Sequence, residues 1–132
     1  MTKLNELLQS ADFKIEKHVP VIDAPDTAQK GEQIMVTIGV GSEIAHPNTT
    51  QHHITWISLY FLPDGEKYPI QIGELTFTAH GSSVQGPDTS TVYTNHKGTL
   101  IFKTERPGTL LASSYCNIHG LWQSSKRLDI SG

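Results

Sequence analysis

Short apolar segments separated by turn residues recur along most of this chain, and they restrict its fold more than any other feature. Residues 33–40 carry isoleucine or valine at every second position, as expected of a strand with one buried face. Residues 54–62 are apolar on both faces and rich in aromatic and β-branched side chains, which favours a central strand. The Pro-Asp-Gly sequence at 63–65 then predicts a turn.

Further strands are expected in five ranges, at residues 70–78, 89–94, 99–104, 109–115 and 125–130. Residues 3–12 differ, because three leucines recur there at helical spacing. About seven short strands divided by turns predict an all-β protein, an antiparallel β-sandwich with a short N-terminal helical segment. The chain of 132 residues shows no internal repeat or linker, so a single domain over residues 1–132 is expected.

The composition argues against several classes of protein. A formal net charge of -3 is unlike that of a nucleic-acid-binding protein, which presents a basic face. No apolar run approaches the length that spans a bilayer, and residues 1–10 lack the apolar core of a signal peptide. A single cysteine cannot form an intrachain disulfide. We therefore expect a cytoplasmic protein that binds neither nucleic acid nor a membrane.

The only cysteine, Cys116, is followed by His119 in a Cys-x-x-His pair, a common chelating spacing. Further histidines stand at His18, His46 and His52. In the expected fold all five positions lie at strand ends or in loops, where residues distant in the sequence can meet. One thiolate with several imidazoles suits a thiophilic transition metal, zinc included. The pattern therefore predicts a metal centre but leaves its ion open.

Several residues also have simpler interpretations. His80 is expected to be a hydrogen-bonded structural residue, and His96, in a polar turn, is expected to be exposed to solvent. A lone buried cysteine is commonly inert packing. Glu16 and Lys17, taken alone, would be a solvated charged pair.

Two other functions fit parts of the pattern. A cupredoxin-like electron-transfer protein also places one cysteine and a downstream histidine on a β-sandwich, usually with a weak axial methionine after that histidine. The only methionines are Met1 and Met35, both far upstream, which disfavours a copper site. A metal-free immunoglobulin-like interaction module would explain the strands but would leave the cysteine and the histidines without a role.

Four long motifs carry a resemblance to a known family. They are Glu-Lys-His-Val-Pro at 16–20, His-Pro-Asn-Thr-Thr-Gln-His-His at 46–53, Phe-Thr-Ala-His-Gly at 77–81 and Ser-Tyr-Cys-Asn-Ile-His-Gly-Leu-Trp at 114–122. In order and spacing they resemble superoxide reductase of the one-iron or neelaredoxin class, which shares the iron-binding domain of desulfoferrodoxin. The resemblance covers nearly the whole chain and implies that the β-sandwich is immunoglobulin-like.

The resemblance also implies a cofactor and a set of site residues. The cofactor is one non-haem iron ion per chain, alternating between Fe2+ and Fe3+. Its implied ligands are the imidazoles of His18, His46, His52 and His119 and the thiolate of Cys116. Glu16 matches a carboxylate that can bind the oxidised iron, and Lys17 matches a positive group beside the open position, so both are implied as catalytic residues.

The reaction implied is the one-electron reduction of superoxide to hydrogen peroxide. Larger relatives hold a second iron centre with four cysteines, which a chain with one cysteine cannot do. The resemblance therefore implies a separate electron donor, reduced rubredoxin or a similar small redox protein. Relatives of this size are often tetramers, so a homo-oligomer is expected. Ala45 stands where a proline often precedes the first loop histidine, and we expect a slightly looser loop with the ligand retained.

Overall fold

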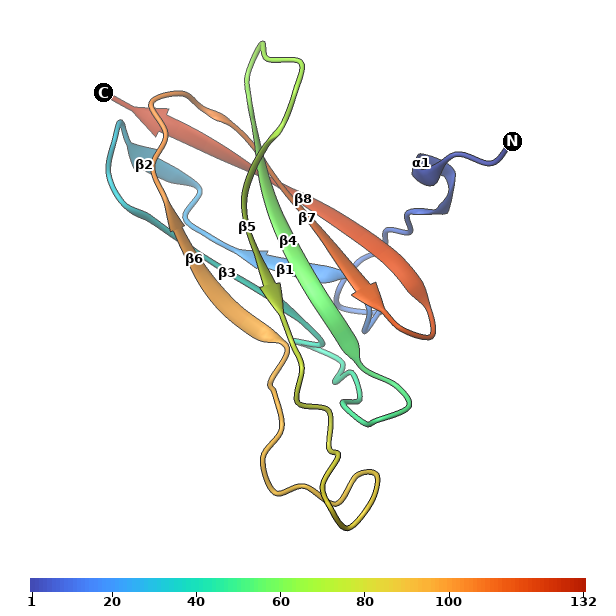
Figure 1. The fold of residues 1–132 in the computed structure, drawn as a ribbon. Helices are drawn as coiled ribbons and strands as arrows, with labels where there is room; N and C mark the ends of the chain where they lie inside the picture. The colour runs from blue at the N-terminus through green and yellow to red at the C-terminus, as the bar shows by residue number, and fades with distance from the viewer.

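The computed structural model describes all 132 residues, and it shows two β-sheets packed face to face with one short helix beside them (Figure 1). The elements are α1 (Leu4–Leu7), β1 (Pro20–Asp23), β2 (Thr27–Gln29), β3 (Ile34–Val40), β4 (Ile54–Pro63), β5 (Ile70–Thr76), β6 (Lys97–Phe102), β7 (Gly108–Cys116) and β8 (Gly120–Ser131). The smaller sheet has the order β1-β3-β6, and the larger has the order β2-β8-β7-β4-β5. The predicted all-β sandwich is confirmed.

Strand pairing is antiparallel except at one edge. The ladders of β4 with β5, β4 with β7 and β7 with β8 are all antiparallel, and so are those of β3 with β1 and β6. β2 pairs in parallel with the end of β8, because the chain crosses from one sheet to the other after β1. The sandwich is therefore mixed at that edge, where a purely antiparallel one was expected.

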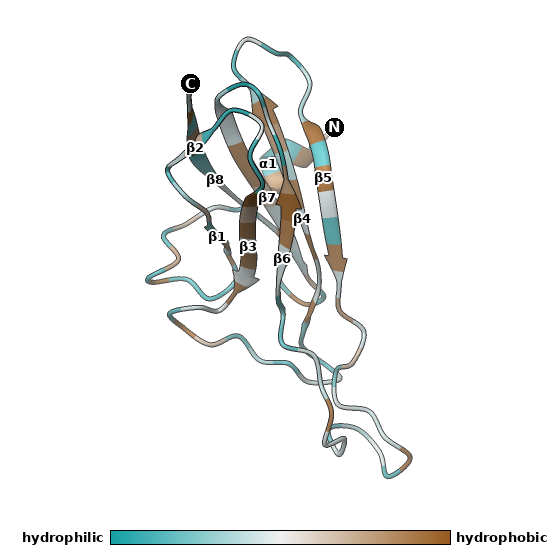
Figure 2. Ribbon diagram, turned by 90° about the vertical axis from the view of Figure 1, so that its left-hand side faces the viewer, coloured by the Kyte–Doolittle hydropathy of each residue, from teal (hydrophilic) through white to brown (hydrophobic).

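The core fills the space between the sheets, and the period of two along each strand decides which side chains enter it. In β3, Ile34, Val36 and Ile38 are at most 1% exposed, as the alternation predicts. β4 has no exposed residue, because its second face is partly covered as well. Figure 2 shows hydrophobic residues concentrated on the strands, while the connecting loops are largely hydrophilic.

Some expected elements differ from those observed. Residues 89–94 form no strand but belong to a long connection, residues 77–96, between β5 and β6. Their backbone amides bond within that connection, from Thr89 and Ser90 to the Gly81 carbonyl and from Thr94 to the Ala79 carbonyl, so no neighbouring strand pairs with them. β1 and β2 were not predicted, because four and three residues are too few to show a period.

The helix expected over 3–12 is confined to α1. Its four residues are all exposed, so no packed apolar face supports a longer helix. Gln9 instead forms a parallel bridge with Trp122 of β8, which takes the backbone out of helical geometry. No helix in the protein has both the length and the apolar character that crossing a membrane requires.

Candidate metal centre

Three segments that are distant in the sequence meet at one end of the sandwich. They are the stretch leading into β1, the loop of residues 41–53 between β3 and β4, and the turn of residues 116–120 between β7 and β8. Figure 1 shows all three close together at the lower right, with the 77–96 connection extending below them. The five predicted ligand residues lie on these segments.

Cys116 is positioned by the register of β7. Every second residue of this strand is buried, and Cys116 continues that series with 0% exposure. The ladder between β7 and β8 ends at the pair of Cys116 with Gly120, so the turn begins directly after the cysteine. The backbone N–H of His119 then donates to Sγ at 3.4 Å. The thiol therefore faces inward, and His119 folds back above it.

His46 and His52 lie on the 41–53 loop, which has no regular structure. Gly41 has a φ of +81°, and a Cβ there would stand 2.6 Å from the backbone nitrogen of His46, so the chain can turn this closely only with glycine. The His46 Nδ1–H donates to the Pro47 carbonyl at 2.7 Å, which leaves Nε2 free to bind an ion. The Thr49 amide donates to the His52 carbonyl at 2.9 Å and closes the loop.

His18 is held from both sides. The hydroxyl of Ser114 on β7 donates to the His18 carbonyl at 3.2 Å, and the ring stacks on Trp122 with centroids 5.2 Å apart and planes inclined by 15°. Glu16 Oε1 accepts from the His18 amide at 2.9 Å and from Nδ1–H at 2.5 Å. Because a carboxylate occupies Nδ1, the other nitrogen, Nε2, is the one that points into the site.

The four imidazoles form a square. Adjacent ring centroids are separated by 4.8 Å for His18 and His46, 4.6 Å for His46 and His52, 5.0 Å for His52 and His119, and 4.5 Å for His119 and His18. The diagonal from His18 to His52 is longer, at 6.1 Å. Cys116 lies beneath this square on the core side, with Sγ 3.6 Å from His46 Nε2 and 3.8 Å from His119 Nδ1.

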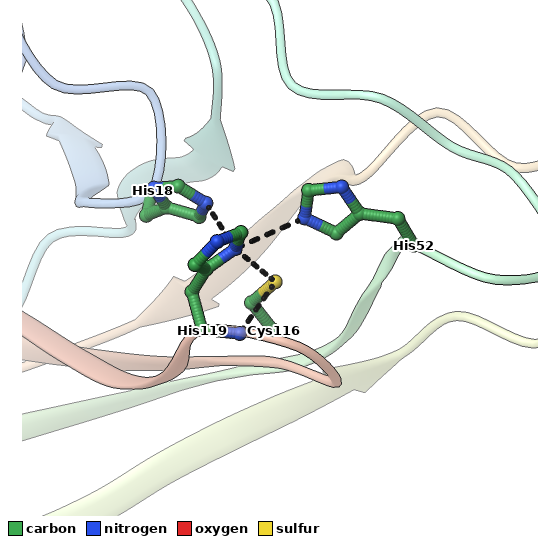
Figure 3. Close-up of side chains that lie close together, drawn as sticks. All are labelled: His18, His52, Cys116 and His119. Atoms are coloured by element: carbon green, nitrogen blue, oxygen red, sulfur yellow. Dashed lines mark hydrogen bonds between the residues drawn. The ribbon is translucent and has the colours of Figure 1, made fainter.

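The distances fit one ion. Nitrogens held at right angles by a single ion, each about 2.1 Å from it, lie about 3.0 Å apart. His119 Nδ1 is 3.1 Å from His18 Nε2 and 3.2 Å from His52 Nε2, and Figure 3 shows these rings and the sulfur converging. The ligand atoms of His18, His52, Cys116 and His119 all lie within 4.8 Å of one another. His46 closes the square beside them.

The electrostatics keep two of these rings in the metal-binding form. Burial and, to a smaller extent, the neighbouring His18, His52 and His96 rings lower the pKa of His46 to about 4, although the hydrogen bond to the Pro47 carbonyl opposes this shift. Burial also lowers the pKa of His52, and nearby His119 and Lys17 contribute. A neutral imidazole offers the lone pair that a metal ion needs. Both rings are therefore ready to bind an ion at neutral pH.

The site residues differ in burial. His18, His46 and Cys116 are buried, whereas His52 is half-buried and His119 is exposed. Because the sulfur takes the core side, the position opposite it faces away from the core. The charge of Lys17 is near enough to lower the pKa of His52. Partial burial raises the pKa of Glu16, but hydrogen bonds from His18 and Lys17 outweigh it and hold that pKa below its usual range.

The remaining histidines differ in how well the sequence anticipated them. His80 is hydrogen bonded through both ring nitrogens, as predicted for a structural residue. The expected exposure of His96 is wrong, since it is only 8% exposed and its ring edge packs against His46 at 5.7 Å. The polar residues around it gave no sign that the loop folds over this ring.

Two supporting residues were not identified from the sequence. Trp122 stacks on His18, and Asn117 joins the two ligand-bearing segments, since its Oδ1 accepts from the His53 amide at 2.9 Å and its Nδ2 donates to the Gln51 carbonyl at 2.9 Å. Trp122 and Asn117 stand in the same motif as Cys116, and that adjacency was the only available sign.

The fold gives no support to the copper alternative, because Met35 is exposed on β3.

Comparisons with known proteins agree with this geometry. The family model described as desulfoferrodoxin matches residues 10–125. The chain is 52% identical over 124 residues to a neelaredoxin from Megalodesulfovibrio gigas, covering 94% of this chain and 95% of that one. It is 52% identical over 126 residues to a superoxide reductase from Pyrococcus furiosus, covering 96% and 99%. A solved structure from Thermotoga maritima covers 100% of both chains with a TM-score of 0.97 and 49% identity.

Proposed function

The chain belongs to the desulfoferrodoxin family, and from that premise we propose how its metal centre works as a superoxide reductase. The single observation that carries the proposal is the square of four imidazoles above a buried thiolate. We propose that His18, His46, His52, His119 and Cys116 bind one iron ion. This donor set of one soft sulfur and four imidazole nitrogens suits iron.

The reaction consumes superoxide, one electron and two protons and yields hydrogen peroxide. Bound iron supplies the electron and an open coordination position. The residues of the chain determine access to that position: four neutral imidazoles and one thiolate leave a ferrous ion with a net charge of about +1, which attracts an anion. Lys17 adds a positive charge beside the site. Its charge is near enough to lower the pKa of His52, which supports this placement. We propose that it steers superoxide toward the open side.

Glu16 is proposed as a ligand of the oxidised ion. Oxidation of the ion would add one positive charge, and binding of the Glu16 carboxylate would offset it. In the structure the carboxylate is bonded to the amide and the ring of His18, so this role requires Oε1 or the free Oε2 to swing toward the open face. Its pKa below the usual range keeps the carboxylate ionised and able to do so.

An external electron donor completes the cycle in this proposal. The only cysteine is Cys116, so the chain has no second thiolate centre to relay electrons internally. A small redox protein such as rubredoxin, docking near the exposed His119, would restore the ferrous ion. A homo-oligomer, tetrameric by resemblance to proteins of this size, is also proposed. A cytoplasmic location is proposed because the thiolate of the only cysteine stays reduced there.

The test is anaerobic purification, iron quantitation and a superoxide assay with reduced rubredoxin. We expect about one iron per chain, and one hydrogen peroxide formed per superoxide consumed with no matching dioxygen. Dioxygen and peroxide in equal amounts would show a dismutase instead. A protein that binds no iron under these conditions, or zinc in preference to iron, would contradict the proposed centre.

A further inference from the structure

The 77–96 connection is hydrogen bonded to the ligand-bearing 41–53 loop through Asn48, a residue of the loop. Asn48 Nδ2 donates to the Thr94 carbonyl at 2.6 Å and the Ala79 carbonyl at 3.3 Å. Thr94 and Ala79 are themselves paired, since the Thr94 amide donates to the Ala79 carbonyl at 2.9 Å and Thr94 Oγ1 accepts from the Ala79 amide at 3.2 Å. The Asn48 side chain therefore closes the base of the connection and fixes the loop to it.

His80 completes this contact. Its Nδ1 lies 2.7 Å from Asn48 Oδ1, and its Nε2 lies 2.8 Å from the Phe77 carbonyl. Two carbonyls bind the amide nitrogen of Asn48, so the oxygen must be the end that faces His80, and Nδ1 must donate. A neutral ring donates to one of these acceptors at a time and a protonated ring donates to both. The bond to Asn48 is thus available in either charge state.

Further contacts join the same two segments. The His80 ring stacks on His53 with centroids 3.6 Å apart and planes 7° apart. Asp88 Oδ1 of the connection accepts from the Thr50 amide of the loop at 2.8 Å. Within the loop itself, the His53 Nδ1–H donates to the Thr49 carbonyl at 2.9 Å. The loop is therefore held at several positions between the two ligands it carries, His46 and His52.

Asn48 is separated from His46 in the sequence only by Pro47. The Pro47 carbonyl, which accepts from His46 Nδ1–H at 2.7 Å, belongs to the peptide group that ends at the Asn48 nitrogen. Anchoring Asn48 therefore fixes the oxygen that orients the His46 ring and leaves its Nε2 directed at the site. Hydrogen-bond partners of this kind commonly change metal affinity by about 10- to 100-fold when removed.

We propose that Asn48 and His80 are positioning residues, which hold the 41–53 loop so that His46 and His52 reach one ion together. This inference rests on the proposed ligand set. It does not depend on the substrate, because its consequences concern how tightly and with what geometry iron is held. Neither residue is among the proposed ligands.

The test uses two substitutions of His80 that retain different halves of the ring. In His80→Asn the amide nitrogen takes the place of Nδ1 and can still donate to Asn48. In His80→Gln the amide nitrogen takes the place of Nε2, keeps the Phe77 contact and loses the Asn48 contact. The readouts are the rate at which ferrous protein loses iron to a chelator and the absorption spectrum of the ferric protein.

We expect His80→Asn to lose iron at nearly the parent rate, and His80→Gln to lose it about 10-fold faster or more, with a shifted ferric band. Asn48→Asp should behave like His80→Gln, because a carboxylate cannot donate to the Thr94 carbonyl. Ser83→Ala is the matched control, since Ser83 bonds to Thr89 within the connection itself, and it should retain the parent iron-loss rate.

Two results would overturn the proposal. Parent-like iron loss in His80→Gln would show that the Asn48 bond does not position the loop. Equal acceleration in both His80 variants would assign the effect to stacking on His53. If Asn48→Asp fails to fold, the His80 pair still decides between these outcomes. Because iron loss and the spectrum are measured without superoxide, failure of the reductase assay would leave this test intact.

Discussion

The 116–120 turn and the 41–53 loop both carry proposed ligands, but they hold them by different means. Cys116 is placed by the register of β7, and the turn after it is closed by the last pair of a long ladder. The loop has no ladder, and its geometry depends on hydrogen-bond partners from elsewhere, the Asn117 side chain on one side and the 77–96 connection on the other. Strand-borne ligands are thus preformed by local periodicity, whereas loop-borne ligands need distant hydrogen bonds.

The largest expected effect follows from removing the strand-borne ligand. Cys116→Ser should abolish the thiolate-to-iron charge-transfer absorption of the oxidised protein, because the protein has no other cysteine to supply a thiolate. Absorption spectroscopy of the ferric protein measures this directly. Ser113→Ala, on the same strand and bonded outward to Tyr60, is the control. A band that persists in Cys116→Ser would refute the assignment of Cys116 as a ligand.

The contrast between turn and loop also explains what the sequence could predict. The inward position of Cys116 follows from alternation in β7, and the core faces of β3 and β4 follow from the same period. The burial of His96 and the bonds of Asn48 to residues 79 and 94 depend on how a long connection folds over the loop. No local pattern encodes that, because its partners are separated by more than 30 residues. The residue pattern pointed to the five candidate ligands but left the ion open, and the resemblance supplied the iron and the assignment of all five as its ligands.

The second prediction concerns the loop histidine in the metal-free protein. Burial lowers the pKa of His46 to about 4, while its ordinary value is about 6.5. Between these values the unfolded chain takes up a proton that the folded chain excludes, so the free energy of unfolding decreases as pH falls from about 6.5 to 4. At about 1.4 kcal/mol for each unit of pKa, this group alone contributes up to about 3 kcal/mol.

Denaturant unfolding of the metal-free protein at several pH values measures this loss. His46→Asn should flatten the dependence on pH, although His52, His80 and His96, whose pKa values are also lowered, will leave some slope. The same slope in parent and variant would mean that His46 is not buried in its neutral form.

Substitutions at two glycines, one in the loop and one in the turn, test how tightly each segment is packed. Gly41 and Gly120 have nearly the same φ, +81° and +83°, but a Cβ at 41 would stand 2.6 Å from the His46 nitrogen, whereas nothing lies within 4 Å at 120. Gly120→Ala should therefore cost only the strain of a left-handed residue, about 1–2 kcal/mol. Gly41→Ala should cost more and should also displace His46.

Thermal unfolding and iron content separate these two effects. We expect both variants to melt at lower temperature, and Gly41→Ala alone to bind iron more weakly. Equal iron retention in the two variants would mean that the loop adapts to the extra methyl group as easily as the turn. In that case the claim that the loop is held rigidly by its neighbours would have to be given up.

A smaller effect is expected from Lys17, which belongs to neither region. Lys17→Gln should slow the reaction with superoxide several-fold and reduce its dependence on ionic strength, because one steering charge is lost. Iron content and spectrum should not change, since the ammonium is not a ligand. Lys30→Gln, which changes the net charge equally but breaks a pair with Glu105, is the control. Pulse radiolysis at two salt concentrations gives the rates, and equal rates for parent and Lys17→Gln would exclude the steering role.

The smallest effect on rate is expected at Glu16, and here two variants separate two roles. Glu16→Gln keeps an oxygen that can accept from the His18 amide and ring, whereas Glu16→Ala loses it. If the carboxylate binds the oxidised ion, both variants should change the resting ferric spectrum while reducing superoxide at nearly the parent rate. If Glu16 acts only by orienting His18, Glu16→Gln should resemble the parent and Glu16→Ala alone should differ. The second pattern would make the segment before β1 like the 41–53 loop, a place where a ligand is held by its neighbours.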